Sequence, residues 1–306
     1  MDENLSPQAP LLPKVAAILI AHNQAGELRR AIEALERSEH REQLEILVVD
    51  CASKDDTPSL GEQFPDVIMQ RLPQHFGATK ALNIATRTAR AEFLLLLSPD
   101  VEVSPGLAAR LAGHLESNSD TAAAAPLLVD IQGQPASGHL QPLPDSESLA
   151  QVCSGGEAPP LSLDLTQDGD LTQESIAVPY AGREALMVRK QFIAGMNYFD
   201  ERFGEYWADA DLAMKIRQAG KKIRVCPGIR ATWHAARKAL PADTLHTSDR
   251  IVGAATLLGK YSGFLAGFGF RWAATLKALM RLDFSLASAL LSGSKLGGET
   301  KKSYPT

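Results

Sequence analysis

The stretch LLLLSPDVEV, residues 94–103, joins four leucines directly to a polar segment that carries Asp100 and Glu102. Consecutive apolar residues are typical of a strand that is buried on both faces of a sheet. Two carboxylates follow such a strand only where its end opens onto water or a ligand, because an unpaired charge is costly to bury. The stretch therefore predicts a central strand whose carboxyl end lies at a polar site.

Strand-like and helix-like segments alternate around this stretch. Residues 15–21, 44–50 and 67–72 are short β-rich runs, whereas residues 27–37 and 79–90 place their apolar side chains on one helical face. Strict alternation of this kind is typical of a sheet whose two faces are both covered by helices. We therefore expect an α/β fold with a mostly parallel, Rossmann-like central sheet.

The second half of the chain is less regular. Residues 130–176 are rich in Gly, Pro, Ser and Gln without periodicity, which predicts a long irregular insertion. Residues 184–190 and 222–228 are strand-like, and a helix is expected to begin near Asp211 and to end at Gly220. The expected organisation is a flexible leader (1–13), a main domain (14–236) and a helical C-terminal region (237–306).

Charge and cysteine content exclude several classes of function. The 31 Lys and Arg residues are outnumbered by 36 Asp and Glu, so we expect no nucleic-acid partner. Cys51, Cys153 and Cys226 are far apart and lack C-x-x-C spacing, which speaks against a disulfide framework or a thiolate zinc site. The N-terminal segment also lacks the basic start and apolar run of a secretory signal. These features predict a cytoplasmic protein.

The C-terminal region has an unusual composition. Between Ile251 and Leu282 every charged residue is basic, and phenylalanines and a tryptophan are interleaved with them. Residues 251–291 are therefore candidates for contact with an anionic membrane surface, which would make the protein peripheral on the inner face of the cell membrane. The alternative is helices that pack on the main domain and turn their basic residues to water.

Polar residues follow three of the predicted strands, and in an open parallel sheet ligands bind at the carboxyl ends of strands. These residues are His22 and Asn23, Asp50 and Ser53, and Ser98 and Asp100. Neither the G-x-G-x-x-G of dinucleotide-binding folds nor the G-x-x-x-x-G-K-[ST] of P-loop enzymes occurs. The pattern thus favours a nucleotide whose diphosphate is bridged to carboxylates by a metal ion.

Five segments resemble, in order, the conserved blocks of family 2 glycosyltransferases with the GT-A fold, particularly the rhamnosyltransferase-like branch. They are AAILIAHNQAGELRRAIEAL, LEILVVDCASKDDT, FGATKALNIATRTARAEFLLLLSPDVEVSP, GREALMVRKQFIAGMNYFDERFGEYWADADLAMKIRQAG and VCPGIRATWH. Together they span residues 14–235. The resemblance implies a GT-A fold with a C-terminal helical appendage and the transfer of a sugar from a nucleotide-diphosphate donor.

The resemblance also implies a role for each matching residue. Asp209 matches the general base, and Asp100 and His234 match ligands of Mn²⁺ or Mg²⁺; Glu102 is expected to face solvent or a metal ligand. Residues matching the nucleotide-sugar site are His22, Asn23, Asp50, Cys51, Ser53, Lys80, Asn83 and Ser98. Candidates for the acceptor side are Gly182, Trp207 and Asp211. Taken singly, Asp100 is more typical of a turn or a helix cap than of a metal site, and Asp209 of a helix cap or a favourable first-turn charge than of a catalytic base.

The chemistry of sugar transfer needs these residue types. A divalent cation stabilises the charge that develops on the leaving diphosphate. A carboxylate within about 3 Å takes the proton of the attacking hydroxyl. A single base without an enzyme nucleophile implies one displacement and hence inversion. The expected acceptor is a saccharide or a lipid-linked molecule, in bacterial surface polysaccharide or glycoconjugate synthesis.

Four residues depart from the family pattern and leave alternatives open. His22 replaces a common Tyr, and Cys51 replaces the usual Asn or Asp. Ser98 stands where the family usually has Asp or Asn, and Ala208 replaces a common Glu. One alternative is a catalytically degenerate binding or scaffold protein that keeps the fold. Another is a sugar-1-phosphate nucleotidyltransferase, which would need a glycine-rich first loop with Arg and Lys, whereas residues 21–27 read AHNQAGE.

Overall fold

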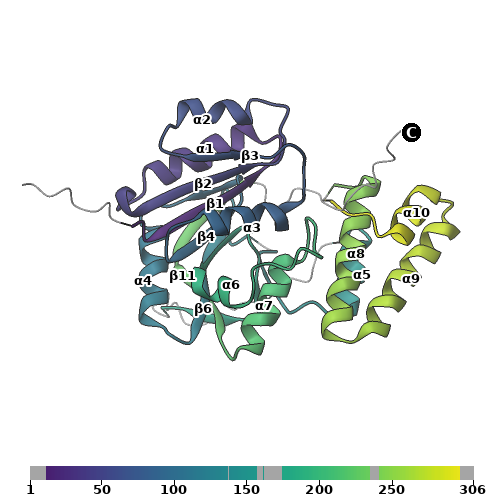
Figure 1. The fold of residues 1–306 in the computed structure, drawn as a ribbon. Helices are drawn as coiled ribbons and strands as arrows, with labels where there is room; N and C mark the ends of the chain where they lie inside the picture. Colours follow the sequence, from purple (N-terminus) through teal and green to yellow (C-terminus); the bar gives the residue numbers. More distant parts are fainter. Residues whose placement is uncertain (1–11, 137, 157–160, 162–173, 235–240, 297–306) are drawn as a thin grey trace, which may run out of the picture.

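The computed structural model describes residues 12–136, 138–156, 161, 174–234 and 241–296 (Figure 1). The flexible leader expected at residues 1–13 falls almost wholly outside the described residues. The α/β class expected from the alternating pattern is confirmed, since helices flank a single large sheet.

A nine-stranded sheet forms the centre of the molecule. One half is entirely parallel and contains, in spatial order, β3 (Ile68–Arg71), β2 (Leu44–Asp50), β1 (Val15–Ala21) and β4 (Phe93–Leu97). The other half contains β10 (Ala185–Arg189), β6 (Thr121–Val129), β11 (Lys222–Trp233) and β5 (Val101–Val103), with β8 (Ile176–Val178) also paired to β11. Only β10, β5 and β8 run against the other strands, so the sheet is mostly parallel.

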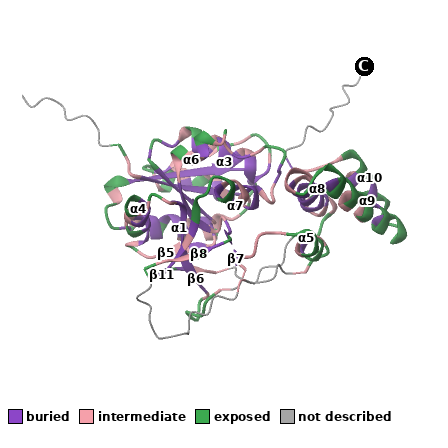
Figure 2. Ribbon diagram, turned by 90° about the horizontal axis from the view of Figure 1, so that it is seen from below, coloured by how far each residue is buried: buried purple, intermediate pink, exposed green. Residues whose placement is uncertain are grey.

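Helices cover both faces of the sheet because the strands bury alternate side chains on opposite sides. Ala17 and Leu19 of β1 pack in one apolar cluster with α1 (Ala25–Glu36) and α4 (Leu107–Ser117). Ala16 and Ile18 pack in the other cluster. That cluster includes side chains of α3 (Ala78–Thr88), α6 (Lys190–Gly195) and α7 (Ala208–Gln218). Figure 2 shows the buried strands enclosed between these helices.

Short elements complete the N-terminal half. They are the 3₁₀ turns η1 (Arg41–Gln43) and η2 (Thr57–Ser59) and the one-turn helix α2 (Leu60–Gln63). The loops after β1 and β2 are therefore short, and they keep the residues that follow these strands close to the edge of the sheet.

The insertion expected to be irregular, residues 130–176, contains regular structure where the structure describes it. Strand β7 (Leu140–Gln141) pairs with β9 (Tyr180–Ala181), and helix α5 spans Ser146–Cys153. A capping box begins α5, because the Asp145 carboxylate accepts from the Ser148 amide at 2.8 Å and the Ser148 hydroxyl accepts from the Asp145 amide at 2.9 Å. The prediction was wrong for this part, because one local cap specifies a helix that lacks strong apolar periodicity. Residues 157–160 and 162–173 lie outside the described residues.

Two further expectations need correction near the candidate site. Helix α7 begins at Ala208, not near Asp211, so Asp209 lies in its first turn. No strand was expected after residue 97, but Glu102 lies on strand β5, which pairs with β11. A three-residue strand is too short to be seen as an alternating pattern.

Three C-terminal helices follow the sheet domain: α8 (Thr244–Tyr261), α9 (Phe264–Met280) and α10 (Phe284–Ser292). Ala254, Leu257 and Leu258 of α8 join the apolar cluster that contains α7. Helices α9 and α10 pack on α8 on its far side from the sheet (Figure 1). No helix among the described residues combines the length and the apolar character needed to cross a bilayer.

Candidate active site

One edge of the sheet gathers the candidate residues. The carboxyl ends of β1, β2, β4 and β11 meet there because these strands run in the same direction. Strand β10 runs the other way, so its amino end reaches the same edge. The Ser98 amide donates to the Glu184 carbonyl at 2.8 Å, and the His234 amide donates to the Asp100 carbonyl at 2.9 Å. Backbone bonds thus join the ends of β4, β10 and β11.

The loops after β1 and β2 are tied together by side chains. Asp50 is fully buried, and its Oδ1 accepts from the Ser53 amide at 2.9 Å. Asn23, in the left-handed region at φ 53°, donates its amide to Ser53 Oγ at 2.9 Å and accepts from the Lys54 amide at 2.7 Å. The Arg71 guanidinium lies 3.5 Å from Asp50 Oδ2. These contacts fix the two loops relative to each other.

His22 and Cys51 are the first residues of the loops after β1 and β2. His22 Nδ1 lies 2.7 Å from the Cys51 carbonyl oxygen, and its ring centre lies 4.6 Å from that of His75. Burial raises the pKa of the Cys51 thiol to about 12, and the charges of Glu205 and Asp50 act in the same direction. The thiol therefore stays protonated at neutral pH and is a poor nucleophile.

Asp100 and His234 lie together at the ends of β4 and β11. Asp100 Oδ1 is buried and has no hydrogen-bond donor among the described residues. His234 Nε2 lies 3.1 Å from Glu102 Oε2, so Glu102 contacts the imidazole directly and is only partly exposed. A carboxylate behind a histidine is the usual arrangement that orients an imidazole for a metal.

These residues fit a divalent cation. A buried carboxylate oxygen without a donor is satisfied by a cation, and a carboxylate with an imidazole suits Mn²⁺ or Mg²⁺. Such ions in nucleotide sites usually take only one or two protein ligands, with phosphate oxygens and water as the rest. No group of three or more His, Cys, Asp or Glu suited to a metal occurs in the described part of the chain.

The start of α3 packs against residues 204–205. The Ala78 amide donates to Glu205 Oε2 at 2.8 Å, and the Thr79 amide donates to the Gly204 carbonyl at 3.0 Å. At Gly77, φ is +81° and an added Cβ would lie 2.9 Å from Gly204, so only glycine fits this approach. The Ala78 and Thr79 amides are therefore already satisfied by protein.

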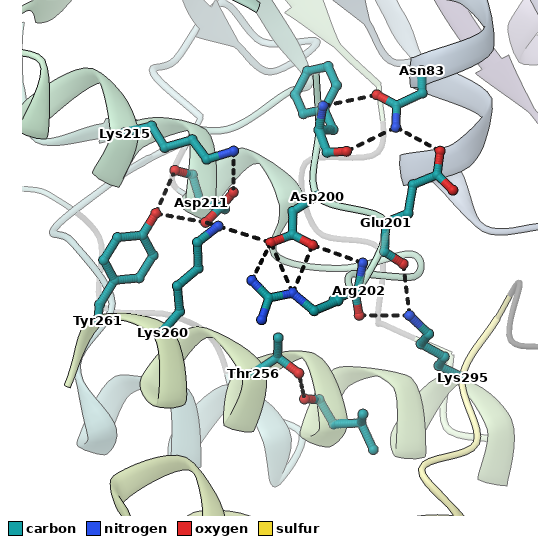
Figure 3. Close-up of polar contacts among 12 residues, drawn as sticks. Asn83, Asp200, Glu201, Arg202, Asp211, Lys215, Thr256, Lys260, Tyr261 and Lys295 are labelled. Atoms are coloured by element: carbon teal, nitrogen blue, oxygen red, sulfur yellow. Dashed lines mark hydrogen bonds and ion pairs between the residues drawn. The ribbon is translucent and has the colours of Figure 1, made fainter. Parts of the chain in front are cut away.

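Lys80 lies in the first turn of α3 and Asn83 about one turn later, and their surroundings differ. The Lys80 ammonium lies 4.6 Å from the centre of the Phe76 ring. Asn83 is buried; it donates to the Phe199 carbonyl at 2.9 Å and to Glu201 Oε1 at 3.1 Å, and it accepts from the Phe199 amide at 2.9 Å (Figure 3). These bonds use both amide hydrogens of Asn83, so in this structure the side chain anchors residues 199–201.

Asp209 is held from two sides at the edge of the sheet. Its Oδ2 accepts from the Tyr180 hydroxyl at 2.9 Å and from the Arg183 amide at 3.3 Å. The Arg183 guanidinium donates to Glu205 Oε1 at 2.9 Å. Burial acts to lower the pKa of Arg183, but the charges of Glu205 and Asp209 outweigh it and leave that pKa raised. The carboxylate of Asp209 therefore lies in a fixed orientation beside a permanent cation.

Glu184 lies between Asp209 and the end of β4. Burial, followed by the charge of Asp209, raises the pKa of Glu184 to about 7, and its Oε2 has no donor among the described residues. A cavity of about 220 Å³ opens beside it. The polar residues that line the cavity are Gln24, Ser98, Arg183, Glu184 and Glu205. This cavity could accept a hydroxyl-bearing group.

The three residues considered for the acceptor side have structural contacts. Asp211 is buried and accepts from Lys260 at 2.6 Å and from the Tyr261 hydroxyl at 2.7 Å, which attaches α7 to α8 (Figure 3). Trp207 donates its indole N–H to the Arg250 carbonyl at 2.9 Å. A Cβ on Gly182 would lie 2.0 Å from Glu184 Oε2. Gly182 therefore belongs to the edge of the sheet, whereas Trp207 and Asp211 face the C-terminal helices.

Sequence reasoning missed Arg183, Glu184 and Glu205. The signal available was two adjacent charges immediately before the apolar run ALMV. That pattern resembles the polar ends of β1, β2 and β4, but here the charges precede the strand. Only a strand of opposite direction brings its beginning to the edge where the others end.

A larger groove, of about 830 Å³, lies elsewhere and contains none of the candidate residues. It is lined at the start of β6, on α6 and at the end of α7, by residues that include Thr121, Phe192 and Lys215. Since β6 begins at the opposite edge of the sheet, this groove is distant from the polar strand ends.

Known proteins share features with this chain. The family described as "Glycosyl transferase family 2" matches residues 16–157, somewhat less than half of the chain. This region includes the strand ends at His22, Asp50 and Asp100. No curated protein matches the sequence.

Several solved structures share the fold. S. aureus TarS 1-349 is 15% identical with a TM-score of 0.54, over 90% of this chain and 74% of that one. GalNAc-T7 with UDP, GalNAc and Mn²⁺ is 15% identical with a TM-score of 0.61, over 93% of this chain and 59% of that one. The mannosyltransferase PcManGT from Pyrobaculum calidifontis, in complex with GDP-Man and Mn²⁺, is 19% identical with a TM-score of 0.52, over 96% and 80%. The chain thus has the GT-A fold, and the family match with this fold supports a glycosyltransferase.

Proposed function

We propose that the chain is an inverting, metal-dependent glycosyltransferase that moves a sugar from a nucleotide diphosphate to an acceptor hydroxyl. One observation carries the proposal: the candidate base and the candidate metal ligand approach the same segment, residues 182–184. The Arg183 amide donates to Asp209, and the Glu184 carbonyl accepts from Ser98, two residues before Asp100. A donor sugar between these two carboxylates would have its diphosphate on one side and the attacking hydroxyl on the other.

Asp209 is the proposed general base. Tyr180 and the Arg183 amide both donate to Oδ2, so the carboxylate is oriented before substrate arrives. As the hydroxyl attacks the anomeric carbon, Asp209 takes its proton, and the bond to the diphosphate oxygen breaks. The thiol of Cys51 is protonated and buried, which argues against a covalent intermediate there. A single displacement inverts the configuration at that carbon.

Asp100 and His234 are the proposed ligands of Mn²⁺ or Mg²⁺. When bound, the ion would neutralise negative charge on the leaving diphosphate. Glu102 would orient the imidazole through its bond to Nε2, which leaves Nδ1 as the nitrogen for the ion. Two structures that share the fold contain Mn²⁺ together with UDP or GDP-Man.

The loops after β1 and β2 are the proposed nucleoside site. Asp50 Oδ2 is buried and, apart from its ion pair with Arg71 at 3.5 Å, makes no hydrogen bond among the described residues, so a ribose or base N–H or O–H group could bond it. His22, Asn23, Cys51 and Ser53 would surround it, and Lys80 would face the diphosphate. The acceptor would be a saccharide or a lipid-linked molecule, in synthesis of bacterial surface polysaccharide or glycoconjugate on the cytoplasmic side, as in the rhamnosyltransferase-like branch.

Nucleoside-diphosphate release tests the proposal. The protein is incubated with Mn²⁺ and a panel of UDP-, GDP- and dTDP-sugars, with and without a chelator. We expect chelator-sensitive release from one donor class. Asp209→Asn should lower this rate by about 10³-fold, because general-base catalysis contributes 10²–10⁴-fold. Asp120→Asn is the matched control, since Asp120 pairs with Lys222 where β6 and β11 begin, at the opposite edge of the sheet.

Two outcomes would contradict the proposal. Full activity of Asp209→Asn would exclude Asp209 as the base. Nucleotide binding without turnover of any donor would instead favour a catalytically degenerate binding or scaffold protein. Ala208 and Ser98, which replace residues usual in the family, are the basis of that alternative. The configuration of the product, read from its anomeric proton coupling, tests inversion separately.

A further inference from the structure

Helix α9 is apolar on the face that it turns outward. Phe264 and Met280, at its two ends, are 75% and 79% exposed, and large apolar residues between them are also exposed. These are Leu265, Phe268, Trp272, Leu276 and Leu279. The rings of Phe264, Phe268 and Trp272 stack in series, with centres 6.0 and 6.3 Å apart. We call these seven side chains the α9 face.

The α9 face forms one continuous stripe. At about 100° of rotation per residue, its seven side chains fall within an arc of roughly 160°. Gly267 and Ala278 lie on the other side of the helix and Thr275 lies near one edge of the stripe; all three are buried. An added Cβ on Gly267 would lie 2.3 Å from the Ala255 carbonyl of α8, so the two helices touch at the backbone. Helix α9 is therefore packed on its inner side and apolar on its outer side as well.

A helix that is apolar all round is normally buried in a core or in lipid. In the described part of the molecule the outer side of α9 contacts neither. Exposed apolar residues continue beyond α9, at Leu282, Phe284 and Leu291. An apolar surface of this extent on a folded protein marks a contact with a partner or a membrane.

The charges near the α9 face identify its partner. Residues 250–282 contain five Lys and Arg and no Asp or Glu, and Asp283, which follows, caps α10 by accepting from the Leu286 amide at 2.9 Å. Lys260 is paired with Asp200 and Asp211, and Arg271 donates to the carbonyls of Leu290 and Leu291. Lys277 and Arg281 are exposed without an acidic partner among the described residues. By rotation angle Lys277 lies about 60° beyond the edge of the α9 face, and Arg281 follows the C-terminal end of the helix, next to the exposed Leu282.

We propose that the α9 face docks on an anionic lipid surface. The apolar stripe would enter the boundary between head groups and acyl chains, while Lys277 and Arg281 contact lipid phosphates. Trp272 suits this boundary because tryptophan is enriched there. Phe264 and Phe268 are typical of the apolar face of a helix that lies in the interface. A two-fold contact with a second copy of the chain fits less well, since a self-complementary interface would add two more basic residues to the same surface.

The contacts of α8 give docking a consequence for the candidate site. Lys260 and Tyr261 donate to Asp211 (Figure 3), and the Trp207 indole N–H donates to the Arg250 carbonyl. Helix α8 is thus attached on both sides of Asp209, and α9 packs on α8. A docked α9 would hold the edge of the sheet in one orientation to the lipid surface. The docking itself does not depend on the proposed transfer activity.

Vesicle flotation with the full chain tests the proposal. The probes are large unilamellar vesicles of pure phosphatidylcholine and of phosphatidylcholine with 30% phosphatidylglycerol. We expect co-flotation with the anionic vesicles and a shift of tryptophan emission to shorter wavelength, which Trp272→Phe should remove. Lys277→Gln with Arg281→Gln should weaken binding roughly 30-fold, because each basic residue near an anionic surface contributes about fivefold.

The apolar contribution is tested by a triple variant, Phe268→Ser, Leu276→Ser and Met280→Ser. Its binding to anionic vesicles should fall at least tenfold. Since these side chains are exposed, its thermal unfolding should match that of the wild type. Ile131→Ser is the matched control, because Ile131 is also exposed but lies outside α9. Equal binding by wild type and triple variant would overturn the proposal. So would absence of vesicle binding together with a dimer that the triple variant abolishes, measured by sedimentation.

Discussion

The backbone amide of Ser98 bonds the carbonyl oxygen of Glu184 at 2.8 Å, which joins the end of β4 to the beginning of β10. This bond places a segment of Arg183 and Glu184 between Asp100 and Asp209. The two carboxylates assigned to metal binding and to proton transfer therefore belong to one continuous edge. Their roles remain predictions, and the variants below test them one at a time.

Removal of the Asp100 carboxylate should abolish the metal-dependent part of nucleotide binding. Asp100 Oδ1 is buried and lacks a donor among the described residues, so its negative charge is available to a cation. We expect calorimetry to show that Mn²⁺ strengthens binding of UDP or GDP to the wild type but not to Asp100→Asn. Glu102→Gln should weaken the Mn²⁺-dependent step by about 10-fold, as is usual when the partner of a ligating histidine is lost. Equal effects of Mn²⁺ on wild type and Asp100→Asn would contradict this assignment.

Glu184 should make the protein less stable as pH rises through neutrality. Its folded pKa is raised from 4.5 to about 7, so the folded state binds a proton that the unfolded state releases. The stabilising contribution is complete below about pH 4.5 and is lost as pH rises to about 7. Relative to the wild type, Glu184→Gln should therefore become more stable between pH 5 and 8, by at most about 3 kcal/mol. Urea unfolding at several pH values measures this difference; a difference that does not change with pH would argue against a raised pKa.

The contact between Asp211 and helix α8 should contribute strongly to stability. The Asp211 side chain is 2% exposed and accepts from Lys260 and Tyr261, while Lys215 lies 3.2 Å away. Asp211→Asn leaves Lys215 and Lys260 without their buried anionic partner. We therefore expect the free energy of unfolding to fall by about 3 kcal/mol. Asp120→Asn removes an exposed pair with Lys222 and should cost less than about 1 kcal/mol. Similar losses in the two variants, measured by urea denaturation, would show that the α7–α8 contact is not tightly coupled to folding.

The three cysteines should be inert in the folded protein. Burial raises the pKa of the thiols of Cys51 and Cys153 to about 12 and that of Cys226 to about 11. At pH 8 the thiolate fraction of Cys51 is on the order of one in ten thousand. We expect no prompt reaction with a thiol reagent at pH 8 in buffer, and reaction of all three thiols in denaturant. Prompt labelling in buffer that Cys51→Ser removes would contradict the environment described for that residue.

Much of the fold could be predicted because its signals are local. Strands β1 and β2 coincide with the apolar runs at residues 15–21 and 44–50, since an apolar run bounded by polar residues specifies a buried strand. The polar residues after these strands also reached one edge, because parallel strands end on the same side. Helix α5 and strand β5 were not predicted. Helix α5 depends on a single capping box, and strand β5 is only three residues long.

The sequence by itself determined which residues form the central strands and which polar groups follow them. The tertiary structure decided which of those groups meet. Reversal of β10 brings Arg183 and Glu184 to Ser98, the pairing of β5 with β11 brings Glu102 to His234, and packing of α8 turns Asp211 away from the edge. Strand direction and helix docking depend on contacts between residues distant in the chain. Their free energy comes from burying surfaces together, which a local pattern of residues does not record.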